Sequence, residues 1–205
     1  MRKTIKLLYA TGNDSKICNM RHRLKGYDIE LVTPKELGIH IEVEEDGSTP
    51  IENARLKAQA YFEKTGISTI AADSGLYIDG IPDDLQPGLY VWRVNGRRLT
   101  GDEMISYYSG LSAKYGGNLK ARYVTGLVLL SGGKEYSIEI PDDDFIISGT
   151  PNENREHRGN PLDVITICPG NGKYYNDCSL DELVAFAGSF DKKCIEWLKE
   201  CGIIS

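Results

Sequence analysis

The sequence has 205 residues, of which 40% are hydrophobic and 26% charged, and its formal net charge is −6. A chain of this length can bury one sizeable hydrophobic core but hardly two, so we expect a single domain over residues 1–205. The acidic balance argues against binding of duplex nucleic acid, which needs a concentrated basic surface, but it allows an anionic small ligand in one local basic pocket.

The cysteines and the N-terminal residues indicate the cellular compartment. The five cysteines are odd in number and contain no C-x-x-C pair, which is typical of reduced thiols rather than of disulfides or a zinc site. The first apolar run is interrupted by Lys6 and ends at Ala10, which is too short for a secretory signal, and no later segment is long and apolar enough to cross a bilayer. We therefore expect a cytoplasmic protein without a membrane partner.

The N-terminal residues predict a strand, a helix and a second strand in succession. Buried-type residues predict the first strand over residues 4–10, and alternation predicts the second over residues 27–33. Between them, Asn13 or Asp14 is a suitable N-cap for a helix over residues 15–24.

A longer helix follows an acidic loop over residues 42–47. Thr49 is a suitable N-cap, Pro50 stands at the first helical position, and Glu52 completes the pattern of a capping box. Apolar residues keep helical spacing as far as Gly66, which ends the helix.

The remaining patterns complete a fold of strands and helices without an internal repeat. A short buried strand over residues 68–72 ends in Asp73-Ser74. The further predicted elements are a helix over 101–111, a hairpin of strands over 121–130 and 134–140, a strand over 162–168 and a mostly helical tail over 179–201. The sequence therefore predicts one α/β domain around a mixed sheet.

Three polar stretches stand where strands end or helices begin. They are the turn "TGNDSK", the pair Asp73-Ser74, and the adjacent Glu44 and Glu45, which precede a helix that carries Asn53 and Lys57 one turn apart. Ligand sites of open α/β sheets collect at the carboxyl ends of strands. Carboxylates suit Mg²⁺, which usually binds one or two of them together with substrate phosphates, while lysines and helix N-termini hold phosphates.

Each stretch also has a purely structural interpretation. The turn "TGNDSK" is not a Walker A motif and is compatible with a simple strand–helix connection, while Asp73 is compatible with a turn cap. The acidic pair is compatible with a solvated face. The functional interpretation depends on the three stretches coming together.

In their order and spacing, five motifs resemble those of the inosine triphosphate pyrophosphatases, which hydrolyse non-standard purine nucleoside triphosphates. The motifs are "ATGNDSK", "ENARLKA", "ADSGL", "PGLY" and "ARY". The resemblance covers nearly the whole chain. It implies an elongated α/β domain around a long mixed sheet, two lobes with a cleft between them, a Mg²⁺ requirement, activity on substrates such as ITP and XTP, and a homodimer.

The resemblance also assigns roles to single residues. Asp73 matches the carboxylate that serves as general base and metal contact, and Glu44 best matches the metal-binding glutamate, with Glu45 as the alternative. The residues that match substrate contacts are Thr11, Gly12, Asn13, Asp14, Ser15, Lys16, Lys57 and Ser74.

The C-terminal third departs from the family pattern. Where the family has Gly-Phe-Gly-Tyr-Asp for gripping the base, this chain has "GNPLD", which keeps only the glycine and Asp163. The family's later lysine falls on Leu183, and its Ser-His-Arg falls on residues 187–189. The pyrophosphatase half is therefore predicted to be intact, whereas the residues that contact the base are rewritten.

This departure leaves two other functions open, a pyrophosphatase for a different nucleotide, as in the Maf-type proteins, and a nucleotide-binding protein without catalysis. It also gives the loop "NREHRGN" two interpretations. Arg155 and Arg158 either replace the lost contacts to the substrate or belong to a solvated surface loop.

Overall fold

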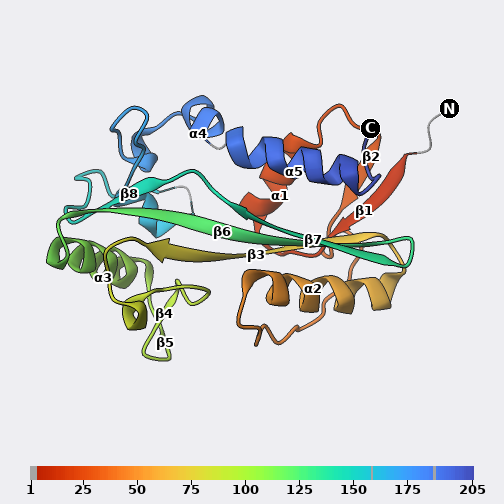
Figure 1. Cartoon of the computed structure of the whole chain (residues 1–205), viewed down its shortest axis with the longest axis horizontal. Coiled ribbons are helices and arrows are strands. Elements are labelled where there is room, and N and C mark those ends of the chain that lie inside the picture. The colour runs from red at the N-terminus through yellow and green to blue at the C-terminus, as the bar shows by residue number, and fades with distance from the viewer. Residues whose placement is uncertain (1–3, 158, 187) are drawn as a thin grey trace. The chain divides into compact units, whose positions relative to one another are not determined.

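The computed structural model of the chain describes residues 4–157, 159–186 and 188–205 (Figure 1). It confirms the α/β class and the mixed sheet. Seven strands form this sheet, in the order β2-β1-β3-β6-β8-β9 with β7 paired to β6. Their bounds are β1 Ile5–Tyr9, β2 Ile29–Val32, β3 Thr69–Ile78, β6 Asn118–Ser131, β7 Lys134–Pro141, β8 Phe145–Ser148 and β9 Thr166–Ile167.

The chain divides into two compact units. Unit 1 combines the residues up to Ser74 with Thr125–Ile140 and Asp191–Ser205, and unit 2 combines Gly75–Val124 with Pro141–Phe190. Within the described residues, no helix is long and apolar enough to cross a membrane.

Unit 1 is built on parallel strands covered by helices. Strand β1 pairs in parallel with β2 and with β3, and Leu8 stands opposite both Val32 and Thr69. The helices are α1 (Asp14–Arg23), α2 (Pro50–Thr65) and α5 (Gly188–Glu200). Figure 1 shows α2 on one side of these strands and α1 and α5 on the other.

Small residues allow α2 to lie close to the sheet. Ala54 and Ala58 of α2 are fully buried against Ala10 of the β1 end, Ala71 of β3 and Val128 of β6. The approach is closest at Gly126, where an added Cβ would stand 2.5 Å from the backbone nitrogen of Ile51. Glycine is therefore the residue that this contact between two backbones requires.

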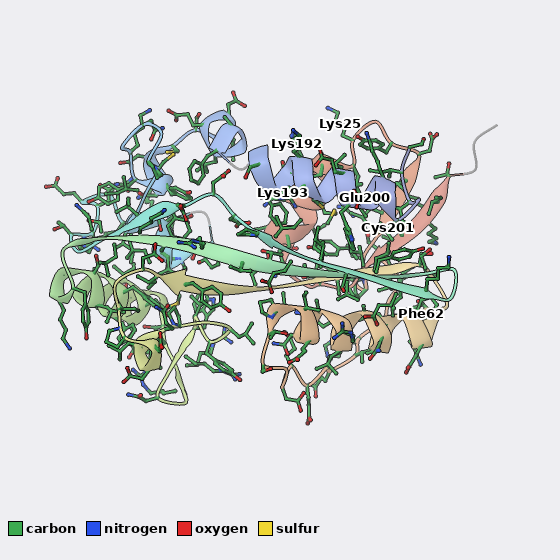
Figure 2. All side chains as sticks on the ribbon, in the orientation of Figure 1. Lys25, Phe62, Lys192, Lys193, Glu200 and Cys201 are labelled. Atoms are coloured by element: carbon green, nitrogen blue, oxygen red, sulfur yellow. The ribbon has the colours of Figure 1, made fainter. Side chains whose placement is uncertain are left out.

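Helix α5 is amphipathic. Figure 2 labels Lys192, Lys193 and Glu200 along it, and all three are exposed. Cys194 and Leu198 lie on the buried side and have no exposed surface. The predicted helical tail is thereby confirmed over its described residues, as α4 (Leu180–Phe186) followed by α5.

The predicted ends of α2 are confirmed at Thr49 and Gly66. The Thr49 hydroxyl oxygen accepts a hydrogen bond from the Glu52 backbone N–H, and Gly66 ends the helix in the left-handed region with φ of 66°. The Glu52 carboxylate also accepts from the backbone N–H and the hydroxyl of Ser48, both at 2.7 Å.

Strand β3 is longer than the sequence predicts. The strand predicted over residues 68–72 does not end before Asp73 but continues to Ile78. Leu76 and Ile78 are buried, so the strand keeps an apolar face beyond the polar pair Asp73-Ser74. The prediction was wrong because aspartate, serine and glycine in succession usually mark a turn. Here Asp73 is tolerated inside the strand because other side chains pair with it.

Unit 2 packs α3 (Gly101–Lys114) into a core with β8 and a 3₁₀ helix, η2 (Pro161–Val164). Helix α3 confirms the predicted helix and runs three residues further. Its N-terminus has a complete capping box between Thr100 and Glu103. The predicted strand over residues 162–168 is wrong. Asn160 caps a 3₁₀ turn that contains Pro161, and only the two residues of β9 are extended.

A segment after β3 covers the edge of that strand in unit 2. The backbone of Leu76 exchanges two hydrogen bonds with that of Gly88, at 2.9 and 3.0 Å. The side-chain amide of Gln86 bonds to both backbone groups of Ile78, at 2.9 and 2.7 Å. The segment includes a 3₁₀ helix, η1 (Asp83–Leu85), and leads to the small hairpin of β4 (Arg93–Val94) and β5 (Arg97–Arg98).

Candidate functional site

The carboxylate of Asp73 is held by two side chains of α2. Asn53 donates from Nδ2 to Oδ2 of Asp73 at 3.1 Å, and Lys57 donates from Nζ to Oδ1 at 3.2 Å. Asn53 and Lys57 stand one helical turn apart, so both face the strand. The Asp73 side chain is only 17% exposed. Its direction is therefore set by the packing of α2 against β3.

Lys57 also binds a second carboxylate. Its Nζ lies 2.9 Å from Oε2 of Glu45, which belongs to the acidic loop before α2. The Lys57 side chain is 14% exposed and that of Glu45 is 43% exposed. One ammonium group thus joins the loop carboxylate to the strand carboxylate. Glu44 is exposed, and Glu45 is the residue that the structure links to Asp73 through Lys57.

The acidic loop is fixed to α2 through Gly47. Its backbone N–H donates to Oδ1 of Asn53 at 2.8 Å. A Cβ added to Gly47 would stand 2.7 Å from that same Oδ1 and 2.7 Å from Cβ of Glu52. Asn53, which is 4% exposed, therefore uses its oxygen for the loop and its nitrogen for Asp73.

The turn "TGNDSK" lies at the carboxyl end of β1, as predicted. Asn13 is the N-cap of α1, and its Oδ1 accepts from the Lys16 backbone N–H at 3.0 Å. The Thr11 hydroxyl accepts from the Asn13 backbone N–H at 3.1 Å. Lys16 extends to the neighbouring strand, where Nζ lies 3.4 Å from the carbonyl oxygen of Ala72. This contact brings Lys16 next to Asp73, while Gly12, Asp14 and Ser15 are exposed at the start of the helix.

Ser74 lies beside Asp73 in β3 and pairs with the neighbouring strand. Its hydroxyl is 2.9 Å from that of Thr125 in β6. The structure thus brings together, within unit 1, the turn after β1, Asp73 and Ser74 of β3, and Lys57 of α2.

The donors around Lys57 fit a magnesium ion. Asp73 and Glu45 supply carboxylate oxygens, the hard ligands that Mg²⁺ prefers, and substrate phosphates usually complete its coordination. Among the described residues, no group of three or more His, Cys, Asp and Glu side chains could hold a metal ion.

Asp163 belongs to unit 2. It lies in η2, is half-buried, and donates from its backbone N–H to the carbonyl oxygen of Asn160 at 3.1 Å. Burial raises the pKa of the Tyr123 hydroxyl, and the charges of Asp163 and Asp142 raise it further, whereas a hydrogen bond with Asn160 lowers it. Asp163 thus stands in a polar and aromatic part of unit 2.

The loop "NREHRGN" is also in unit 2. Arg155 is exposed, and Arg158 and Ala187 lie outside the described residues. The loop is tied to η3 (Tyr175–Asp177) by Asn176, whose Nδ2 donates to the carbonyl oxygens of Asn154 and Glu156 at 2.8 and 3.0 Å.

The sequence predictions missed two side chains as members of the site. Asn53 was noticed beside Lys57 but was given no role, although the shared helix face was a usable signal. No sequence pattern marks Thr125 as part of the site, because its contact with Ser74 depends on the pairing of β3 with β6.

The comparison with known families is decisive for the classification. The family described as the Ham1 family matches residues 7–159. The chain belongs to the Ham1 family. This membership confirms the resemblance to the inosine triphosphate pyrophosphatases. The match contains Asp73 and every other predicted site residue of unit 1, and it ends just before η2.

Named relatives of this Ham1 chain extend over most of its length. It is 32% identical over 184 residues to a protein named dITP/XTP pyrophosphatase from Caldanaerobacter subterraneus subsp. tengcongensis, with 87% of each chain covered. It is also 32% identical over 207 residues to a protein of the same name from Aquifex aeolicus, with 96% of this chain and 98% of the relative covered.

Solved structures agree with the fold. The structure of a HAM1 protein from Coxiella burnetii has a TM-score of 0.78 at 23% identity and covers 96% of this chain and 99% of its own. The Staphylococcus aureus Ham1 protein has a TM-score of 0.73 at 22% identity, with 96% and 98% covered.

Proposed function

We propose that this protein is a Mg²⁺-dependent pyrophosphatase that hydrolyses non-standard purine nucleoside triphosphates to a nucleoside monophosphate and pyrophosphate. The observation that carries the proposal is the grouping of Lys16, Lys57 and Asp73 beside the carboxyl end of β1 and the middle of β3. The names of the Ham1 relatives support the substrate class.

The residues of the site have separate roles in this reaction. The reaction depends mainly on charge neutralisation and on an aligned water rather than on covalent catalysis. Lys16, Lys57 and the N–H groups at the start of α1 bind the phosphate oxygens and stabilise their negative charge. Magnesium, when bound, supplies further neutralisation and orients the attacking water.

Asp73 accepts the proton of the attacking water. Its oxygens accept hydrogen bonds from Asn53 and Lys57, and an ionised carboxylate has about four acceptor positions, so acceptor capacity remains for a water. Asp73 and either Glu45 or Glu44 would hold the metal. The ion pair through Lys57 favours Glu45.

The test is a pyrophosphate-release assay with ITP, XTP, dITP and the common nucleoside triphosphates, each with and without Mg²⁺. The proposal expects turnover that needs Mg²⁺ and is fastest with the non-standard purines. Preference for a common nucleotide would favour a pyrophosphatase of a different specificity, and binding without turnover would favour a nucleotide-binding protein.

The proposal includes a homodimer in the cytoplasm. Tyr90 is 53% exposed and Trp92 is 37% exposed, and aromatic side chains of this kind are enriched in protein interfaces. The odd number of cysteines without a C-x-x-C pair is typical of a reducing compartment. Light scattering of the purified protein tests the dimer, and microscopy of a tagged chain tests the location.

A further inference from the structure

The ammonium group of Lys57 contacts both carboxylates that would hold the proposed metal ion. It lies 3.2 Å from an oxygen of Asp73 and 2.9 Å from an oxygen of Glu45, the two carboxylates best placed to hold the metal. A positive group between two carboxylates neutralises their mutual repulsion. It also occupies acceptor positions that a divalent cation would need.

We propose that Lys57 serves as an internal substitute for the metal ion, and that metal binding releases it toward the phosphates of the substrate. This inference rests on the Mg²⁺-dependent function proposed above. The ammonium group and the metal ion compete for the same oxygens, so one must move for the other to bind. A lysine suits this exchange because its ammonium is a point charge on a flexible four-carbon stem.

The carboxylate of Asp73 keeps its direction when Lys57 leaves. Its second oxygen is bonded to Asn53, and Asn53 is itself locked by the backbone N–H of Gly47. Glu45 lies on the loop that contains Gly47 and is 43% exposed, so it can remain near Asp73 and bind a hydrated ion. The part of the site that must rearrange is therefore the Lys57 side chain alone.

The exchange makes metal and nucleotide binding cooperative. Without a nucleotide, a metal ion must break both contacts of Lys57 and leave a half-buried ammonium without a carboxylate partner, which opposes binding. With a triphosphate present, the released ammonium gains phosphate oxygens as partners. The same coupling must raise nucleotide affinity when the metal is bound, because linkage between two sites is reciprocal.

The direct test is calorimetric titration of Mg²⁺, and separately of Mn²⁺, into the full-length protein without nucleotide. Lys57→Met removes the competing charge and keeps a long helix-forming side chain. Lys64→Met is the matched control, because Lys64 is an exposed lysine in the last turn of the same helix. Thermal unfolding of each variant checks that the fold is retained.

The substitute role predicts that Lys57→Met binds the metal about fivefold more tightly than the wild type, the size expected when the competing contacts of the ammonium group to Asp73 and Glu45 are removed. Lys64→Met should match the wild type. Unchanged or weaker binding by Lys57→Met would mean that the lysine merely organises the two carboxylates, and would overturn the inference. Absence of metal binding by both proteins would overturn it as well.

A second measurement follows the lysine itself. Acylation of Lys57 by a small amine-reactive reagent, quantified by mass spectrometry, should become faster when Mn²⁺ is added and slow again when a non-hydrolysable triphosphate is added. A rate that does not respond to Mn²⁺ contradicts the exchange. Turnover by the wild type in the pyrophosphate assay tests the proposed function independently. A protein that hydrolyses the substrate but fails the two tests above would contradict the exchange of Lys57 and leave the proposed function intact.

Discussion

Asn53→Ala removes an amide that joins the acidic loop to Asp73. The wild-type side chain is 4% exposed and makes two hydrogen bonds, at 3.1 Å to the Asp73 carboxylate and at 2.8 Å from the Gly47 N–H. A hydrogen bond to a charged group contributes about 1.5–3 kcal/mol and a neutral one about 0.5–1.5 kcal/mol. The higher helix propensity of alanine offsets roughly 0.5 kcal/mol of this loss.

The expected net loss is therefore about 1.5–4 kcal/mol of the free energy of unfolding. For a chain of this size it corresponds to a fall in Tm of about 3–16 °C. Turnover should fall about 10- to 100-fold, because Asp73 loses the contact that fixes its direction. Thermal unfolding and pyrophosphate release measure the two effects, and Asn19→Ala, at an exposed position of α1, is the control. A variant with wild-type Tm and turnover would refute the role of Asn53 as the link.

Three further predictions concern the site and the loop of unit 2. Asp73→Asn should lower turnover by more than about 10²–10⁴-fold while the circular dichroism spectrum is retained, because a general base and a metal contact are lost together; near-wild-type activity would exclude both roles. Glu45→Gln should raise the Mg²⁺ concentration needed for half-maximal activity more than Glu44→Gln does, and the reverse ranking would identify Glu44 as the ligand. If the loop "NREHRGN" contacts the substrate, Arg155→Ala and Arg158→Ala should each raise KM about 10- to 150-fold, the value of a hydrogen bond to a charged group; unchanged kinetics in both would assign the loop to the solvated surface.

The sequence predicted those parts of the site that depend on local chemistry. The turn after β1 and the helix with Asn53 and Lys57 were visible because capping residues and helical spacing act over a few neighbours. The structure brings Lys16 and Lys57 together beside Asp73, which lies inside β3 rather than at its end. The resemblance favours Glu44 as the metal-binding glutamate, whereas the ion pair with Lys57 favours Glu45, and this ion pair depends on how Gly47 docks the loop onto α2.

The two errors in the fold have different physical causes. The residue pattern predicts a strand end at Asp73 and a strand over residues 162–168. In the first case, contacts from α2 stabilise a charged residue inside β3. In the second, the cap by Asn160 and the ring of Pro161 favour a 3₁₀ turn over an apolar strand. Neither contact can be located by the period of hydrophobic residues.

The pairing of Gln86 with β3 has a consequence for self-association. A strand edge whose backbone N–H and C=O groups have no hydrogen-bond partner can pair with a strand of another molecule. At Ile78 the side-chain amide of Gln86 forms the two backbone hydrogen bonds that such a strand would make. At Leu76 the backbone of Gly88 forms the corresponding two hydrogen bonds. A side-chain amide can bond to these backbone groups without adding a further strand edge with unpaired backbone groups. This part of β3 is thereby closed to the growth of the sheet from one molecule into the next.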